Sequence, residues 1–151
     1  QAIILAAGMG RRLGELTKNN TKCMVSVNGI TLIDRMLSQL SSLNLSRVII
    51  VIGYKELKKY IGNEYKGLKI EYIDNPVYDK TNNIYSLALA KKELQEDDTL
   101  LVESDLIFDD AMFPMIVNSP YPNLALVQNT ELDELSPAAQ IIGAVNTNVN
   151  D

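Results

Sequence analysis

The 151-residue chain is predicted to adopt an α/β fold, in which a mostly parallel sheet carries helices on both faces. Apolar runs of strand length alternate with segments of helical periodicity, which is typical of parallel strands joined by crossover helices. A glycine-containing loop directly follows the first run, and ligands bind open sheets of this kind beyond the carboxyl ends of the strands. With 46% hydrophobic residues, the chain has enough apolar material for one packed domain.

The apolar runs predict five strands: Ala2 to Leu5, Arg47 to Ile52, Lys69 to Ile73, Thr99 to Glu103 and Leu124 to Val127. Apolar residues repeat at helical spacing from Leu32 to Leu43 and again from Ile84 to Leu94, which predicts two helices with core-facing stripes. A shorter helix is expected from Asp110 to Val117, with Pro114 near its start.

The first strand leads into a loop suited to binding phosphates. Small residues from Ala6 to Gly10 let backbone N–H groups approach an anion closely. Arg11 and Arg12 add guanidinium groups that match phosphate oxygens, and Lys22 is a compact charge able to reach a different phosphoryl group. This arrangement suits a nucleoside triphosphate, although a tight turn with arginines in solvent would use the same residues.

Two other glycine-rich motifs do not match. The dinucleotide fingerprint requires a third small residue where Leu13 stands, and an acidic residue after the second strand, where the chain reads Gly53-Tyr54. The Walker loop requires lysine directly after its last glycine, whereas Lys22 lies far beyond Gly10.

These residues resemble the nucleotidyltransferases that join a nucleoside triphosphate to a phosphorylated small molecule and release pyrophosphate. Their signature reads L-A-A-G-x-G-x-R-L, then threonine, then P-K. The chain has Thr21 in place of the usual proline and matches the signature at Leu5, Ala6, Ala7, Gly8, Gly10, Arg12, Leu13, Thr17 and Lys22. The likeness covers about residues 1–127, expected to be the nucleotidyltransferase core, and leaves 128–151 as an unassigned tail.

The resemblance implies a Rossmann-like three-layer sandwich of the nucleotide-diphospho-sugar transferase type. It also implies that the loop from Leu5 to Arg11, including Met9, binds the nucleotide, with Gly8 to Gly10 on the β- and γ-phosphates. By the same likeness, Arg12 pairs with the leaving pyrophosphate and Lys22 stabilises charge at the α-phosphate.

Asp105 is the candidate metal ligand and third catalytic residue. It follows the buried-strand pattern Leu100-Leu101-Val102, where acidic groups reach solvent at the end of a strand, and a carboxylate there can hold Mg²⁺ together with triphosphate and water. A turn-capping role is the alternative. Glu103 could support the metal indirectly, and Asp109 and Asp110 are expected to cap a helix.

A polar segment from Asp79 to Leu87 opens the second predicted helix, and Asn82 or Asn83 as N-cap would explain its composition without a ligand. Its sequence Asn-Asn-Ile-Tyr-Ser resembles the cytidylyltransferases that act on phosphocholine and related aminoalkyl phosphates or phosphonates. That likeness places Asn75, Asn83 and Ser86 near the base or ribose, with Tyr85 packing beneath it.

Composition and charge narrow the function further. The chain has no histidine, so carboxylates, lysine and a hard metal ion must carry any chemistry. The net charge of −5 combines +7 in residues 1–92 with −12 from Glu93 onward. This distribution fits either a phosphate-binding part followed by metal-binding carboxylates, or an acidic surface without a function. One cysteine, no leader pattern and no membrane-length apolar run predict a cytoplasmic protein without membrane insertion, and the acidic balance disfavours nucleic acid.

The leading hypothesis is therefore a Mg²⁺-dependent cytidylyltransferase that uses CTP and a small phosphate or phosphonate acceptor. A sugar-1-phosphate transferase using UTP or dTTP and a non-catalytic nucleotide-binding module remain as alternatives. The acceptor, a second metal ligand and the oligomeric state stay open, and the chain is expected to be either a complete folding unit or the first part of a larger enzyme.

Overall fold

The computed structural model describes residues 1–10 and 21–126. Within them, the strands β1 (Ala2–Ala6), β4 (Val48–Ile52), β5 (Glu64–Tyr65), β6 (Leu68–Asp74) and β7 (Leu100–Glu103) form one sheet in the order β5-β6-β4-β1-β7. The pairs β6–β4, β4–β1 and β1–β7 are parallel, whereas β5 pairs antiparallel with β6. The mostly parallel sheet predicted from the sequence is confirmed.

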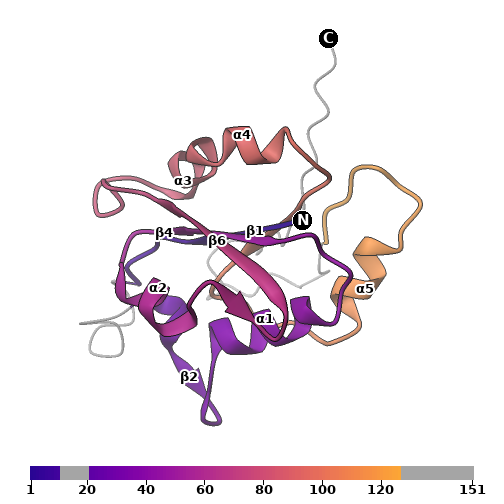
Figure 1. Ribbon diagram of the computed structural model, residues 1–151, viewed down its shortest axis with the longest axis horizontal. Coiled ribbons are helices and arrows are strands. Elements are labelled where there is room, and N and C mark those ends of the chain that lie inside the picture. The colour runs from indigo at the N-terminus through magenta and orange to yellow at the C-terminus, as the bar shows by residue number, and fades with distance from the viewer. Residues whose placement is uncertain (11–20, 127–151) are drawn as a thin grey trace, which may run out of the picture.

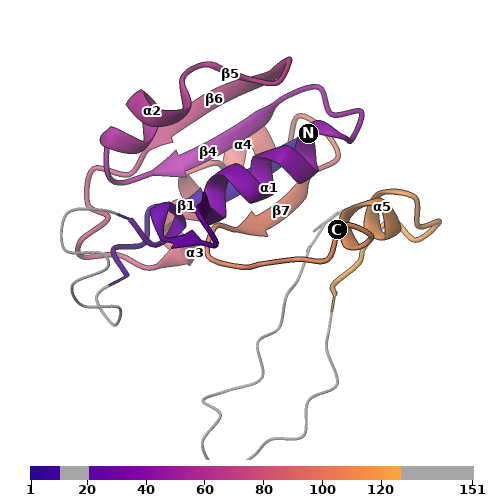
Figure 2. The ribbon, with the colours of Figure 1, turned by 90° about the horizontal axis from the view of Figure 1, so that it is seen from below.

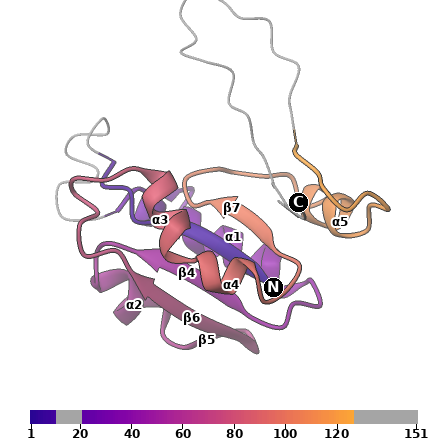
Figure 3. The same cartoon turned by 90° about the horizontal axis from the view of Figure 1, so that it is seen from above.

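Helices cover both faces of this sheet, as Figure 1 shows with the sheet seen nearly edge-on. On one side lie α1 (Leu32–Ser41) and α2 (Glu56–Ile61), with α5 (Met112–Val117) beyond them at one end. On the other side, α3 (Asn83–Leu89) and α4 (Lys91–Leu94) lie over the sheet (Figure 3). The expected three-layer sandwich is therefore present.

Strand β1 shows why its segment is continuously apolar. Every residue of β1 and of its neighbour β4 is buried. Along β1, Ala2, Ile4 and Ala6 join the core beneath α1, while Ile3 and Leu5 join the smaller core beneath α3 and α4. A strand that packs on both faces cannot alternate apolar and polar residues.

Helix α1 forms because its sequence supplies an N-cap and a stripe of apolar residues. The Thr31 hydroxyl accepts a hydrogen bond from the Asp34 amide at 3.1 Å and donates one to the Asp34 carboxylate at 2.7 Å. This capping satisfies a backbone donor that the first turn leaves unpaired. The helix lies along the sheet (Figure 2). Its buried residues are Leu32, Ile33, Met36, Leu37 and Leu40.

The structure differs from the predicted elements in several places. The helix predicted from Ile84 to Leu94 is two helices, because Ala90 leaves helical geometry where it packs, fully buried, against the sheet. The short helix begins at Met112, so Pro114 lies in its first turn, where no backbone N–H is required. Over the predicted strand from Leu124, Leu126 forms an isolated bridge and Val127 lies outside the described residues.

Five short elements were not predicted from the sequence. These are the 3-10 helix η2 (Lys22–Met24), helix α2, strand β5, and the hairpin formed by β2 (Ser26–Val27) and β3 (Ile30–Thr31). Each has six residues or fewer, which is too short for hydrophobic periodicity to show. In the described ranges, no helix has the length and apolar character needed to cross a bilayer.

Candidate active site at the carboxyl edge of the sheet

Three segments singled out in the sequence meet at one edge of the sheet. The glycine loop follows β1, Asp105 follows β7, and Asn75 follows β6, and all these strands run in the same direction. The amide of Ser104 donates to the Leu5 carbonyl at 3.3 Å, and the amide of Asn75 donates to the Ile52 carbonyl at 2.7 Å. The parallel register thus brings residues up to about a hundred positions apart to one rim.

The loop after β1 exposes its backbone at Gly8. Leu5, Ala6 and Ala7 are buried, whereas Gly8 is exposed, and a Cβ atom on Gly8 would meet no atom within 4 Å. Packing within the described structure therefore does not require glycine at position 8, which leaves close approach by a ligand as a reason for it. Gly10 has a φ of +62°, a left-handed conformation that favours glycine directly. Met9 is half-buried.

Arg11 and Arg12 lie outside the described residues, as do Leu13 and Thr17 of the signature. The roles that the resemblance implies for the two arginines remain predictions.

Lys22 and Asp105 form an ion pair at this rim. The Lys22 Nζ atom lies 2.6 Å from Oδ2 of Asp105, and the two side chains are 33% and 32% exposed. Both charges are thus partly shielded from water yet accessible to a ligand. The structure brings together the two described residues that the sequence assigned to catalysis.

Buried neighbours hold Lys22 in place. Thr21 and Cys23 are both buried, and the Thr21 hydroxyl lies 2.8 Å from the Cys23 sulfur. Burial raises the pKa of the Cys23 thiol to about 11. The thiol therefore stays protonated near neutral pH and acts as a packing group rather than as a nucleophile.

The surroundings of Asp105 fit a hard divalent cation that completes its coordination with ligand oxygens. Asp105 and Glu103 are close enough that the negative charge of Asp105 adds to burial in raising the pKa of Glu103. A cation would relieve this repulsion. The described ranges contain no group of three or more acidic, histidine or cysteine side chains arranged to hold a metal. Mg²⁺ at Asp105 would leave coordination positions open to phosphate and water.

A second polar pair, formed by Asn83 and Glu103, lies on the α3 side of the same rim. The Asn83 amide nitrogen donates to both carboxylate oxygens of Glu103, at 3.0 and 2.9 Å. The neighbouring Asn82 is the N-cap of α3, and its side-chain oxygen accepts from the Tyr85 amide at 3.3 Å. The capping role is thus filled by Asn82, which leaves Asn83 to bind Glu103.

Asn75 and Ser86 lie together, but both are buried. The Asn75 amide nitrogen donates to the hydroxyls of Ser86 and Thr81, each at 3.1 Å, and its side-chain oxygen accepts from the Val77 amide at 3.1 Å. Each of the two residues is 2% exposed. In the structure this cluster ties the loop after β6 to α3, while the predicted contact with a nucleotide stays a prediction.

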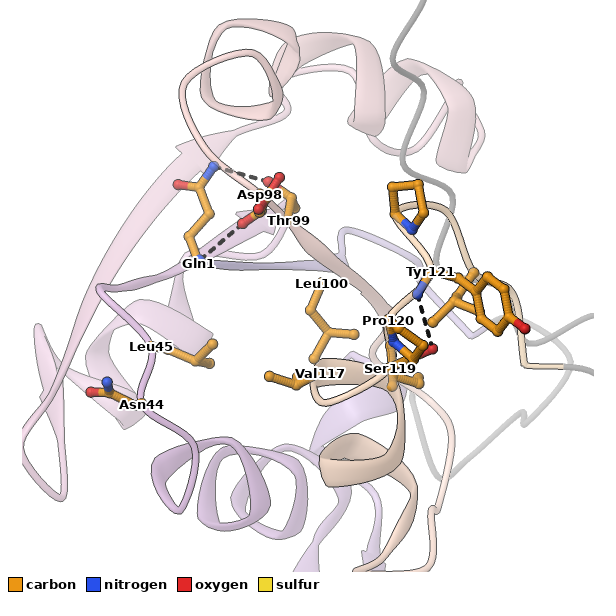
Figure 4. Close-up of a pocket in the computed structure, with 13 residues that line it drawn as sticks. Gln1, Asn44, Leu45, Asp98, Thr99, Leu100, Val117, Ser119, Pro120 and Tyr121 are labelled. Atoms are coloured by element: carbon orange, nitrogen blue, oxygen red, sulfur yellow. Dashed lines mark hydrogen bonds between the residues drawn. The ribbon is translucent and has the colours of Figure 1, made fainter.

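The surface has one hollow near this rim and another at the opposite edge of the sheet. An open hollow of about 580 Å³ lies at the start of α3 and is lined by Asp79, Lys80, Thr81, Asn82 and Tyr85. A cavity of about 470 Å³ lies at the opposite, amino edge of the sheet, between Gln1, Leu100 and the segment after α5 (Figure 4). Among the described residues that line it there is an acid, Asp98, but no lysine or arginine. The second cavity is therefore poorly suited to a triphosphate.

Comparison with known proteins identifies the relatives of this chain. The model of the family described as "MobA-like NTP transferase domain" matches residues 2–132. The CMP-5'-(3-aminopropyl)phosphonate synthase of Streptomyces rubellomurinus is 34% identical over 122 residues, which are 80% of this chain and 19% of that protein. The 2-aminoethylphosphonate cytidylyltransferase of Lancefieldella rimae is 36% identical over 110 residues, which are 72% of this chain and 44% of that protein.

Among solved structures, CTP:phosphocholine cytidylyltransferase (LicC) from Streptococcus pneumoniae superposes with a TM-score of 0.63 at 38% identity. The match covers 73% of this chain and 47% of that one. The chain thus spans less than half the length of each of these three relatives.

Proposed function

Because this chain belongs to the MobA-like NTP transferase domain family, we propose that it transfers CMP from CTP to a small acceptor and releases pyrophosphate. The acceptor is phosphocholine or a related aminoalkyl phosphate or phosphonate. Two relatives named for aminoalkyl phosphonates and one named for phosphocholine support this substrate class. The observation that carries the proposal is the Lys22–Asp105 pair beside the glycine loop.

In the proposed reaction, an ionised oxygen of the acceptor phosphate or phosphonate attacks the α-phosphorus of CTP. The bond from that phosphorus to the oxygen bridging to the β-phosphate breaks, and pyrophosphate departs with the electron pair. The attacking oxygen is already ionised at neutral pH, so the step requires no general base, in agreement with the absence of histidine.

The chain's own residues position the triphosphate and neutralise its charge. The exposed backbone at Gly8 holds phosphate oxygens, and Gly10 forms the left-handed turn that follows it. Lys22 offsets negative charge that develops at the α-phosphate, and Asp105 holds Mg²⁺. When bound, Mg²⁺ supplies charge neutralisation and orientation of the phosphates. Arg12 is assigned to the departing pyrophosphate, as the sequence signature implies, and Arg11 to the nucleotide.

A substrate panel tests the proposal. CTP, UTP and dTTP are each combined with phosphocholine, phosphoethanolamine, 2-aminoethylphosphonate and glucose 1-phosphate, with and without Mg²⁺, and pyrophosphate release is measured. We expect release with CTP, an aminoalkyl acceptor and Mg²⁺ together. Release with UTP or dTTP and glucose 1-phosphate would instead indicate a sugar-phosphate transferase. Binding of CTP without release from any combination would indicate a non-catalytic module.

A further inference from the structure

The two polar pairs at the carboxyl rim lie toward different faces of the sheet. Lys22 belongs to η2, which contacts α1, and it pairs with Asp105. Glu103 lies on β7 two residues after Leu101, which packs with the core beneath α3, and it pairs with Asn83 at the start of α3. The end of β1, which leads into the glycine loop, pairs with β7 in a register that sets Leu5 beside Glu103.

The two sides differ in the ligand groups that they can accept. The cation of Lys22 and a metal at Asp105 attract phosphate oxygens. The α3 side presents the carboxylate of Glu103, which repels phosphates, together with exposed apolar surface from Ile84 (75% exposed) and Tyr85 (41% exposed). A nucleotide with its phosphates at Lys22 therefore has its uncharged, planar part, the nucleobase, toward α3.

Glu103 fixes the orientation of the Asn83 amide. An ionised carboxylate only accepts hydrogen bonds, so the Asn83 NH₂ group must face it, and both carboxylate oxygens lie within 3.0 Å of that nitrogen. The Asn83 carbonyl oxygen must then point away from Glu103. It accepts no hydrogen bond from any part of the chain that the structure describes, although the residue is exposed at the rim.

We infer that Glu103 is a positioning residue for base selection, because it holds Asn83 with its carbonyl oxygen presented to the nucleobase. This inference rests on the proposed function and specifies its nucleotide. A fixed acceptor pairs with the exocyclic amino group of cytosine and opposes the carbonyl oxygen that uracil carries at the same ring position. The Asn83–Glu103 pair therefore selects CTP over UTP.

The experiment measures the dissociation constants of CTP and UTP with Mg²⁺ but without acceptor, by calorimetry at pH 8. The wild-type protein is expected to prefer CTP. In Glu103→Gln, the new side chain both donates and accepts, so Asn83 can bind it in either orientation. We expect the CTP/UTP preference of this variant to fall about tenfold, as for the loss of one oriented hydrogen bond worth about 1.4 kcal/mol.

Two further variants separate this mechanism from a loss of charge or of stability. Glu96→Gln makes the same chemical change at the opposite edge, where Glu96 binds Arg47 at 2.6 Å, and should keep the wild-type preference. Asn83→Ala should lose the preference by itself, and adding Glu103→Gln to it should cause no further loss, because Glu103 acts through Asn83.

The binding and activity measurements test base selection and the proposed function separately. If Glu103→Gln weakens CTP and UTP binding equally, or if the wild-type protein does not distinguish them, the inference is overturned even when pyrophosphate release from CTP persists. If no acceptor gives pyrophosphate release with CTP, the proposed function fails, whereas the binding preference can still be measured.

Discussion

Lys22 is the described residue on which the proposed chemistry depends most directly. Lys22→Ala removes the cation placed 2.6 Å from Asp105 and should lower pyrophosphate release by about 10²–10³-fold, as for loss of one group that stabilises transition-state charge. The fold should persist, because a partly exposed ion pair contributes about 1 kcal/mol or less.

Lys59 offers a matched control for this substitution. It forms an ion pair of similar length, 2.7 Å, with Glu56 within α2, where both side chains are exposed. Lys59→Ala should keep both activity and circular dichroism near wild type. Near-normal pyrophosphate release by Lys22→Ala would remove Lys22 from the mechanism.

Glu103 should make the protein less stable as the pH rises. Burial, and then the charge of Asp105, raise its pKa in the folded state, so folding favours the protonated form. Its contribution to stability is greatest below the pKa of an unfolded glutamate and is lost as the pH rises through the higher folded pKa.

Glu103→Gln should therefore melt at a higher temperature than wild type at pH 7 without ligand, and the difference should disappear near pH 4. The measurement is thermal unfolding at both pH values. An equal difference at pH 4 and pH 7 would show that packing, rather than ionisation, separates the two proteins.

At the scale of elements, the contact between Gly53 and Tyr78 fixes the loop after β6. A Cβ atom on Gly53, which directly follows β4, would lie 2.2 Å from Cγ and 2.6 Å from Cβ of Tyr78. Because these atoms are near the Tyr78 backbone, the ring cannot simply rotate away. Gly53→Ala should cost about 1–3 kcal/mol of unfolding free energy through overpacking.

A double-mutant cycle measured by urea unfolding checks this cause. Tyr78→Ala removes the atoms that a new methyl group would meet, so Gly53→Ala should cost much less in that background. The same cost in both backgrounds would mean that backbone conformation, and not Tyr78, requires glycine at position 53.

The sequence predicted the elements with long, strong patterns. The four described parallel strands lie within one or two residues of their predicted bounds, and the Leu32–Ser41 helix lies inside the predicted stripe. Parallel strands alone were enough to place the glycine loop, Asn75 and Asp105 at one edge, because the strands share one direction. Short elements such as η2, which carries Lys22, have no periodicity and depend on tertiary packing of Cys23.

The pairing of side chains within the site was less predictable. Asn83 and Glu103 are 20 residues apart on different elements, and nothing in either local sequence indicates their contact. Asn75 is a different case: the likeness placed it near the nucleotide, and in the structure its side chain is hydrogen-bonded to Ser86, Thr81 and Val77 inside the fold, so the nucleotide contact stays a prediction. Hydrogen-bonding type alone does not distinguish a buried structural amide from an exposed one at a rim.

At the scale of the whole molecule, the basic and acidic parts of the sequence meet at both edges of the sheet. Lys22 pairs with Asp105 at the carboxyl edge, and Arg47 pairs with Glu96 at the amino edge. Arg47 also binds Glu71 at 2.9 Å and donates to Gln1 at 2.9 Å, so this side chain is fully used within the fold. The uneven charge along the chain therefore gives a structural ion pair, Arg47–Glu96, at the amino edge. At the carboxyl edge it gives Lys22–Asp105, which lies in the candidate site.

The sheet also divides the apolar interior into two cores, which should respond independently to mutation. Ile33 on α1 lies in the larger core and Ile49 on β4 in the smaller one, and both are buried. Each Ile→Val substitution should cost about 0.5–1.5 kcal/mol. Because the backbone of the sheet separates the two sites, the double variant should equal their sum within about 0.5 kcal/mol, in one cooperative transition.

Ile50 provides the comparison within one core, since it follows Ile49 on β4 but faces the same core as Ile33. Urea unfolding of Ile33→Val with Ile49→Val, and of Ile33→Val with Ile50→Val, gives two coupling energies measured in the same way. The first should be near zero, whereas the second can depart from zero because the two cavities share neighbours. A coupling of more than about 1 kcal/mol between Ile33 and Ile49, or two separate transitions, would show that the layers do not behave as independent cores around a rigid sheet.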